Sequence, residues 1–293
     1  MRKLEVYIEE DGDFVLAGQI QGETWEDARF IYEKSYLENQ SHQPVSISLP
    51  FQEDAFSPFE TRCYFEGLLP EGYTRRCVAG WMHVAEEDYL SVLAGLGNEC
   101  LGAVRICEPG AGGCSPSYKK ISREELLEFA KEGASKSAQF LAKAHLSLTG
   151  ASGKTGLYYD NKDGWYMPFG TAPSTHIVKQ SHVRLSGIVA NEQLCLRTAK
   201  ILGIDVPESF IISVGTGEHI LFATKRFDRL MQEDSRVIDG KKVPFRLQQE
   251  DFAQAPTNAH ISEYTPEAGF SIVAETQGNE LDQAKTLEVI GNA

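Results

Sequence analysis

A short run rich in glycine, hydroxyl side chains and lysine lies near the middle of the chain. Residues 149–155 read Thr-Gly-Ala-Ser-Gly-Lys-Thr and stand between two segments of β-type composition, 146–148 and 156–159. Glycine lets backbone amides approach an anion closely and lysine adds positive charge, so this composition is typical of a phosphate-binding loop. The residues expected to contact phosphate are Gly150, Ala151, Ser152, Gly153, Lys154 and Thr155.

The same run invites comparison with the Walker A loop of P-loop NTPases. That motif needs a glycine five residues before Gly153, where Leu148 stands, and a helix directly after the loop. Here residues 156–159 read as a strand that turns at 161–164 and returns through 165–168. A glycine loop inside a sheet, as in protein kinases, is therefore the favoured interpretation, with a P-loop NTPase as the alternative.

A lysine and a glutamate further along resemble the phosphate-binding pair of a kinase. Residues 175–179 alternate as a strand, and its Lys179 shares a half-buried face with Ile177, so the ammonium needs a carboxylate or a phosphate. Glu192 begins a predicted helix, and in kinases such a glutamate holds the strand lysine against the ATP phosphates. A favourable position near the positive end of the helix is the alternative role for Glu192.

The helix that carries Glu192 is expected to be capped by Asn191 or Ser186 and to end at Gly203. Its predicted buried stripe consists of Leu194, Thr198 and Ile201. A hairpin formed by 209–214 and 219–224 is expected to follow. In a kinase lobe the exit of this hairpin meets adenine, so the residues expected there are Lys225, Arg226 and Phe227.

The residues before the glycine run read as a smaller unit of strands and helices. Asp11-Gly12 predicts a tight turn between strands at 4–8 and 14–18. The remaining patterns predict a helix at 24–34, a strand at 45–50, helices at 62–69 and 73–82, and a glycine-punctuated turn leading into a strand that ends at Ile106.

A stretch rich in Gly, Ser and Pro at 109–118 predicts a linker, and Ser122 then starts a capping-box pattern typical of a helix. The expected fold class is α+β. The expected organisation is a small N-terminal α/β subdomain at 1–110, a linker at 111–120, a kinase-like N-lobe of antiparallel sheet and one helix at 121–252, and an incomplete C-lobe segment or tail at 253–293.

The composition narrows the classes of function. The net charge of −14 argues against direct, non-specific binding to nucleic acid or an anionic membrane, because phosphate binding needs clustered Lys and Arg. The six cysteines form no Cys-x-x-Cys pair, so neither a zinc site nor a disulfide framework is indicated. The sequence shows no secretion signal and no apolar run long enough for a membrane helix, which predicts a cytoplasmic location.

From about Leu4 to Ala255 the chain resembles the HipA family of bacterial toxin–antitoxin serine/threonine kinases. The resemblance rests on several short runs in combination. They are Ser46–Pro50, Gly67–Gly72, Gly102–Val104, Leu146–Ala151 with Lys154-Thr155, Thr175–Lys179, Asn191-Glu192, Arg226–Arg229 and Gln249–Asp251.

The resemblance implies binding of ATP with Mg²⁺, with Lys179 on the phosphates, Glu192 paired to it, and residues 225–227 along the adenine. It also implies that Ser147 is autophosphorylated and that its phosphate expels the glycine loop, while an ordinary local hydrogen bond of this hydroxyl is the alternative. The implied partners are a small, basic, helix-turn-helix antitoxin of the HipB kind, which carries the DNA contact, and a protein substrate such as glutamyl-tRNA synthetase or another aminoacyl-tRNA synthetase.

After Asp251 the sequence departs from the family pattern. The 42 residues that follow contain no Asp-x-His-x-x-Asn catalytic loop, so no catalytic or metal-binding residue is identified. Glu250 and Asp251 are expected to cap a helix rather than to act as a base. The expected function is the ATP-binding portion of a HipA-type kinase toxin, inactive as it stands, and a pseudokinase or regulatory binding module is the alternative.

Overall fold

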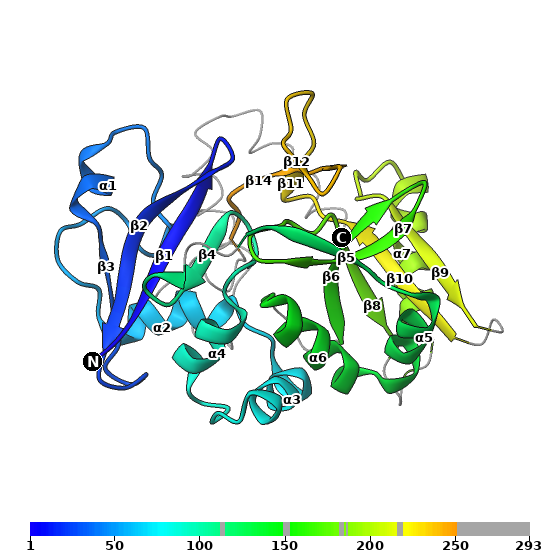
Figure 1. Ribbon diagram of the computed structural model, residues 1–293, viewed down its shortest axis with the longest axis horizontal. Helices are drawn as coiled ribbons and strands as arrows, with labels where there is room; N and C mark the ends of the chain where they lie inside the picture. Colours follow the sequence, from blue (N-terminus) through cyan, green and yellow to red (C-terminus); the bar gives the residue numbers. More distant parts are fainter. Residues whose placement is uncertain (112–114, 149–152, 182–184, 186, 216–218, 251–293) are drawn as a thin grey trace.

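The computed structural model describes residues 1–111, 115–148, 153–181, 185, 187–215 and 219–250. Two antiparallel sheets lie side by side, and helices α2, α3, α4 and α6 run along one side of them (Figure 1). The first sheet has four strands in the order β3-β2-β1-β4, and the second has six in the order β5-β7-β6-β8-β10-β9. The mixed architecture of helices and antiparallel sheets agrees with the predicted α+β class.

The first sheet is built on the predicted hairpin. Strands β1 (Arg2–Glu10) and β2 (Asp13–Gly22) pair in antiparallel register, and β4 (Val104–Cys107) pairs with the other edge of β1. The turn between β1 and β2 consists of Asp11 at φ 49° and Gly12 at φ 88°. Asp and Gly tolerate positive φ, so the local sequence alone accounts for this turn.

The helix predicted at 24–34 is wrong. Residues Arg29–Tyr32 form strand β3 against β2, and only the short helix α1 (Lys34–Glu38) follows. Thr24 does act as a local hydrogen-bonding residue, because its amide donates to the Asp27 carboxylate at 2.7 Å, but the result is a turn. Pairing with β2 prevailed over helical spacing, because it buries Phe30 and the ring of Tyr32 on one face of the sheet.

The strand predicted at 45–50 is also wrong. The backbone folds into a tight turn, in which the Leu49 amide donates to the Ser46 carbonyl at 3.1 Å. The Ser48 amide donates to the Ser46 hydroxyl at 2.9 Å. These local bonds of Ser46 compete with strand formation, and alternation of residue types did not reveal them.

The helices of the N-terminal subdomain and of the segment after it follow the prediction in outline. Helices α2 (Pro58–Gly67) and α3 (Gly72–Met82) are confirmed, and α2 begins earlier than expected because Ser57 and Glu60 form a capping box. Helix α5 (Arg123–Glu132) starts with the predicted Ser122 capping box. Two further helices were not predicted, α4 (Tyr89–Leu96) and α6 (Ala134–Ala144).

The second sheet carries the lysine and glutamate singled out above. Its strands are β5 (Ser117–Lys120), β6 (Lys154–Asp160), β7 (Gly164–Phe169), β8 (His176–Gln180), β9 (Ser209–Val214) and β10 (His219–Lys225), and helix α7 (Ile188–Ile201) packs on β9 and β10. The predicted hairpins β6–β7 and β9–β10 are confirmed. Strand β5 pairs with β7, so residues 117–120 belong to the sheet rather than to the linker expected at 111–120.

The segment after β10 crosses back towards the first sheet. It contains four two-residue strands, paired as β11 (Arg229–Leu230) with β14 (Phe245–Arg246) and β12 (Val237–Ile238) with β13 (Lys241–Lys242). One hydrophobic cluster extends from Leu4 in the first sheet to Leu221 in the second, so the two halves share a core. Within the described residues, no helix has both the length and the apolar character needed to cross a membrane.

Candidate functional site

Lys179 and Glu192 meet as the sequence predicted. Lys179 lies on β8 and Glu192 on α7, and their Nζ and Oε1 atoms are 2.6 Å apart. The Lys179 and Glu192 side chains are 23% and 33% exposed, so the ion pair is partly accessible to solvent. The Lys179 ammonium also lies 5.8 Å from the centre of the Phe222 ring. The ion pair holds the ammonium near the surface of the second sheet, where an anion can reach it.

A second lysine lies on the neighbouring strand, directly opposite the first in the register. Lys154 on β6 is the register partner of Lys179 on β8. Burial, and next the charge of Lys179, lowers the pKa of Lys154 to about 8, while the charges of Glu71 and Glu192 act in the opposite direction. Among the described residues, no salt bridge joins Lys154. The arrangement therefore leaves positive charge that an anionic ligand such as phosphate would balance.

The glycine run is only partly described, since Gly150, Ala151 and Ser152 lie outside the described residues. Gly153 is tightly enclosed, because a Cβ atom there would lie 2.4 Å from Nε2 of Gln180. Thr155 is buried within β6. The run follows a helix, α6, and not a β-type segment as expected. Helix, loop and strand is the reverse of the strand–loop–helix order of a Walker A site, in agreement with the prediction that a strand follows.

Helix α7 differs from the prediction in its start and in its buried face. It begins at Ile188, and the Asn191 amide donates to the Gly187 carbonyl, so Asn191 lies inside the first turn rather than capping it. The other proposed cap, Ser186, lies outside the described residues. Because Glu192 falls beyond the first turn, placement at the positive helix end explains it poorly.

The predicted buried stripe of α7 is wrong as well. Leu194 and Ile201 are 63% and 85% exposed, and the buried side chains of the helix are Val189 and Gln193. The helix packs mainly against β9 and β10 at one edge of the sheet, so a narrow face is covered. Which face is covered depends on the docking of the helix, and apolar spacing alone did not show it.

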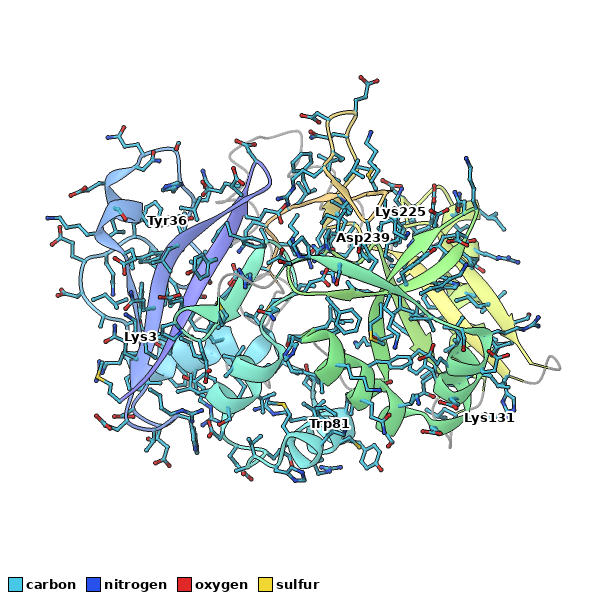
Figure 2. The ribbon with its side chains drawn as sticks, viewed as in Figure 1. Lys3, Tyr36, Trp81, Lys131, Lys225 and Asp239 are labelled. Carbon is cyan, nitrogen blue, oxygen red and sulfur yellow. The ribbon has the colours of Figure 1, made fainter. Side chains whose placement is uncertain are left out.

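The three residues expected along adenine take different positions. Lys225 ends β10 and is exposed (Figure 2), and the Phe227 side chain is 73% exposed. The Arg226 side chain is fully buried and points into a cluster of charges, so only its backbone faces the strand end, where its amide donates to the Thr175 carbonyl at 2.9 Å. Adenine binding by these residues stays a prediction.

Ser147 is buried with its hydroxyl in use. Its Oγ donates to the Leu68 carbonyl at 2.7 Å, and its amide donates to the Glu99 carbonyl at 2.8 Å. The hydroxyl is hydrogen-bonded, but to a residue 79 positions away rather than locally as the alternative role expected. Phosphorylation of Ser147 stays a prediction, and it requires this segment to leave the position seen here.

Sequence reasoning missed a buried network of four charged residues. The Arg226 guanidinium donates to Asp228, with Nη2 2.6 Å from Oδ2, and Nη2 of Arg229 lies 3.0 Å from Oε1 of Glu99. Burial raises the pKa of the Asp228 carboxyl, but Arg226 and Arg229 outweigh this and hold the pKa well below its usual range. Burial, and next the charge of Arg226, lowers the pKa of Arg229 to about 10. The alternating charges of 226–229 were the available signal, but the position of Glu99 could not be read from the sequence.

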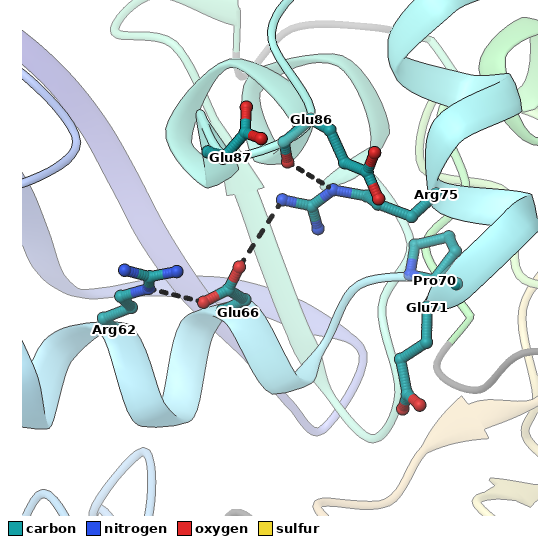
Figure 3. A pocket seen from close by; sticks show the side chains of 8 residues that line it. Arg62, Glu66, Pro70, Glu71, Arg75, Glu86 and Glu87 are labelled. Carbon is teal, nitrogen blue, oxygen red and sulfur yellow. Dashed lines mark hydrogen bonds and ion pairs between the residues drawn. The ribbon is translucent and has the colours of Figure 1, made fainter.

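A separate cavity of about 360 Å³ lies between α2, α3 and the segment before α4 (Figure 3). Its lining residues are Arg62, Glu66, Pro70, Glu71, Gly72, Arg75, Glu86 and Glu87. Nε of the buried Arg75 donates to the Glu86 carbonyl at 3.1 Å, and its Nη2 lies 3.7 Å from Glu66. These contacts join the three segments. In the part of the chain that the structure describes, no cluster of His, Cys, Asp or Glu suits a metal ion.

Comparison with known proteins agrees with these features. Residues 4–107 match the sequence model of the HipA N-terminal domain, and residues 146–290 match that of the HipA-like C-terminal domain. The second match extends beyond Ala255, where the resemblance was expected to end. The first match ends close to the end of β4, and the second begins just before the glycine run.

Relatives with assigned names point the same way. The chain is 29% identical over 265 residues to the putative kinase Y4mE of Sinorhizobium fredii, covering 87% of this chain and 60% of that protein. It is 26% identical over 217 residues to the serine/threonine-protein kinase toxin HipA of Shewanella oneidensis, covering 74% of this chain and 47% of that protein. The chain thus spans about half to three-fifths of the length of these relatives.

A solved structure shows the same fold. The HipA, HipB and operator DNA complex of Shewanella oneidensis contains a chain that matches with a TM-score of 0.67 and 22% identity, over 92% of this chain and 60% of that one. This structural match agrees with the architecture of two antiparallel sheets and flanking helices. The chain belongs to the HipA family.

Proposed function

We propose that residues 146–250 form the nucleotide-binding part of a HipA-type serine/threonine protein kinase, with strands β6 to β10 and helix α7 in the place of a kinase N-lobe. The observation that carries this proposal is the contact of 2.6 Å between Lys179 and Glu192. A strand lysine held by a helix carboxylate is how kinases present an ammonium to the ATP phosphates. Membership of the HipA family supports the same assignment.

Each residue has a distinct role in this proposal. Lys179 binds the α- and β-phosphate oxygens, and Glu192 keeps the ammonium pointed at them. Lys154, opposite Lys179 in the sheet, adds a second positive charge, and Gly153 with the preceding run supplies backbone amides. Lys225 to Phe227 meet the adenine through their backbone. ATP enters with Mg²⁺, which neutralises charge between its phosphates.

The proposal is tested by titrating the 293-residue chain with Mg-ATP in a calorimeter. Lys179→Ala is expected to weaken binding by at least about tenfold, because the charge-assisted bond to phosphate is lost. Lys200→Ala is the matched control, since this lysine is exposed on the same helix as Glu192. Unchanged affinity in Lys179→Ala would contradict the proposal. A P-loop NTPase predicts the opposite pattern, with Mg-dependent hydrolysis lost in Lys154→Ala and unaffected by Lys179→Ala.

For the whole protein we propose phosphorylation of a protein substrate, such as an aminoacyl-tRNA synthetase, and control by a HipB-like antitoxin. The Shewanella oneidensis structure with the same fold is a complex of HipA, HipB and operator DNA, which supports the antitoxin. The net charge of −14 favours a basic partner that carries the DNA contact. Mobility-shift assays test this. The chain alone is expected not to shift operator DNA, whereas adding the chain to an antitoxin–DNA complex is expected to slow that complex further.

A further inference from the structure

Several of the short runs that carried the family resemblance meet at the junction of the two halves. The Gly102 amide donates to Asp228 at 2.9 Å, and the Ile47 amide donates to Glu250 at 3.1 Å. The Ser147 hydroxyl reaches the Leu68 carbonyl. These contacts join residues far apart in the sequence, so the runs share a place in the fold. The proposed roles in nucleotide binding leave most of them unexplained.

Glu99 lies at the centre of this junction and is 2% exposed. Its backbone holds the segment that leads into the glycine run. The Glu99 amide donates to the His145 carbonyl at 3.3 Å, and the Glu99 carbonyl accepts from the Ser147 amide at 2.8 Å. Together these bonds make a parallel bridge between Glu99 and Leu146.

The side chain of the same residue holds the other side of the candidate site. Oε1 of Glu99 accepts from the amide and the hydroxyl of Ser174, at 2.8 Å and 3.0 Å, just before β8. It also accepts from Arg229 at 3.0 Å, and Nη1 of Arg226 lies 3.6 Å away. One residue of the N-terminal subdomain thus contacts the entrance of the glycine run, the start of the strand with Lys179, and the exit of β10.

We infer that Glu99 is a positioning residue for the nucleotide site, through which the N-terminal subdomain sets the affinity for nucleotide. This inference rests on the nucleotide-binding role proposed above. No hydrogen bond or ion pair joins Glu99 to Gly153, Lys154, Lys179 or Glu192, the described residues of the candidate phosphate site, so we expect its effect to pass through the backbone of Ser147 and through Ser174. Buried, charge-assisted bonds of this kind hold geometry firmly, because water does not compete for them.

The test compares two buried carboxylates that join the same two halves. Glu99→Gln removes the charge that faces Arg226 and Arg229. Glu9→Gln is the matched control, because Glu9 is 5% exposed and pairs with Arg246, and among the described residues it has no hydrogen bond or ion pair with Ser147 or Ser174. Mg-ATP affinity is measured by calorimetry and thermal stability by circular dichroism. Hydrogen exchange of the amides at 146–148 and 226 is measured without nucleotide.

The expected result is that both variants lose stability, while only Glu99→Gln weakens Mg-ATP binding, by about tenfold, within the usual range of coupling between sites. Exchange at 146–148 and 226 is expected to rise in Glu99→Gln and to stay unchanged in Glu9→Gln. Equal effects of the two variants on exchange would overturn the inference, whether or not ATP binds. Failure of the unaltered chain to bind Mg-ATP would instead contradict the proposed function.

Ser174→Ala provides a milder variant if Glu99→Gln does not fold. It removes one bond to Glu99 at 3.0 Å and one from Arg226 at 3.2 Å, and it leaves the charges balanced. Faster exchange of the Arg226 amide with little change in thermal stability is expected. Unaltered exchange of that amide in Ser174→Ala would count against the inference.

Discussion

The titration of Lys154 offers a sharp test of the phosphate site. In the chain without nucleotide, burial and then the charge of Lys179 lower its pKa to about 8. A bound phosphate favours the charged form, so the pKa rises on binding and a proton is taken up. Between pH 7 and pH 9 the protonated fraction of free Lys154 falls from about nine-tenths to about one-tenth. Affinity for ATP is therefore expected to fall by about tenfold over this range.

The assay is calorimetric titration with Mg-ATP in two buffers of different ionisation enthalpy, which gives both the affinity and the number of protons taken up. At pH 9 the expected uptake is about 0.9 proton per ATP bound. Phosphate groups titrate near pH 6, below this range, and so do not mimic the effect. Lys154→Met keeps the side chain long but uncharged, and it is expected to remove both the pH dependence and the proton uptake.

Two results would refute this reasoning. One is an affinity that stays constant from pH 7 to pH 9 in the unaltered chain. The other is a pH dependence that persists in Lys154→Met, which would place the titrating group elsewhere. Lys200→Met is the control for loss of a lysine, because Lys200 is exposed on α7. Its pH dependence is expected to match that of the unaltered chain.

Three further substitutions and one control variant test the described structure by urea unfolding. Asp228→Asn leaves two buried arginines undercompensated, and we expect a loss of about 3 kcal/mol in the free energy of unfolding; a loss near zero would argue against the network. Ser147→Ala removes the buried bond to the Leu68 carbonyl, with an expected loss of about 1 kcal/mol. Burial, and next the charge of Lys225, lowers the pKa of His176 to about 4 from a usual 6.5, so its contribution to stability is complete above pH 6.5 and is lost as the pH falls towards 4. His176→Gln is expected to remove this acid dependence and the exposed His83→Asn to keep it.

Local chemistry explains the parts of the fold that were predicted correctly. The Asp11-Gly12 turn and the Ser122 capping box depend on residues within a few positions of one another. The strand of Lys179 and the hairpin after α7 follow from alternation and turn residues. Where a pattern could be satisfied in two ways, the prediction failed. Residues 29–32 have helical spacing, yet they pair as a strand because β2 lies beside them.

The candidate site divides in the same way. The sequence by itself determined that a lysine on a strand and a glutamate on the next helix were available as a pair, because residue type and order are enough for that inference. Only the tertiary structure decided that Lys154 lies opposite Lys179, that Arg226 turns away from the site, and that Glu99 joins its parts. The contacts of Glu99 with Ser174 and Arg229 span 75 and 130 residues, and no local pattern records such distant neighbours.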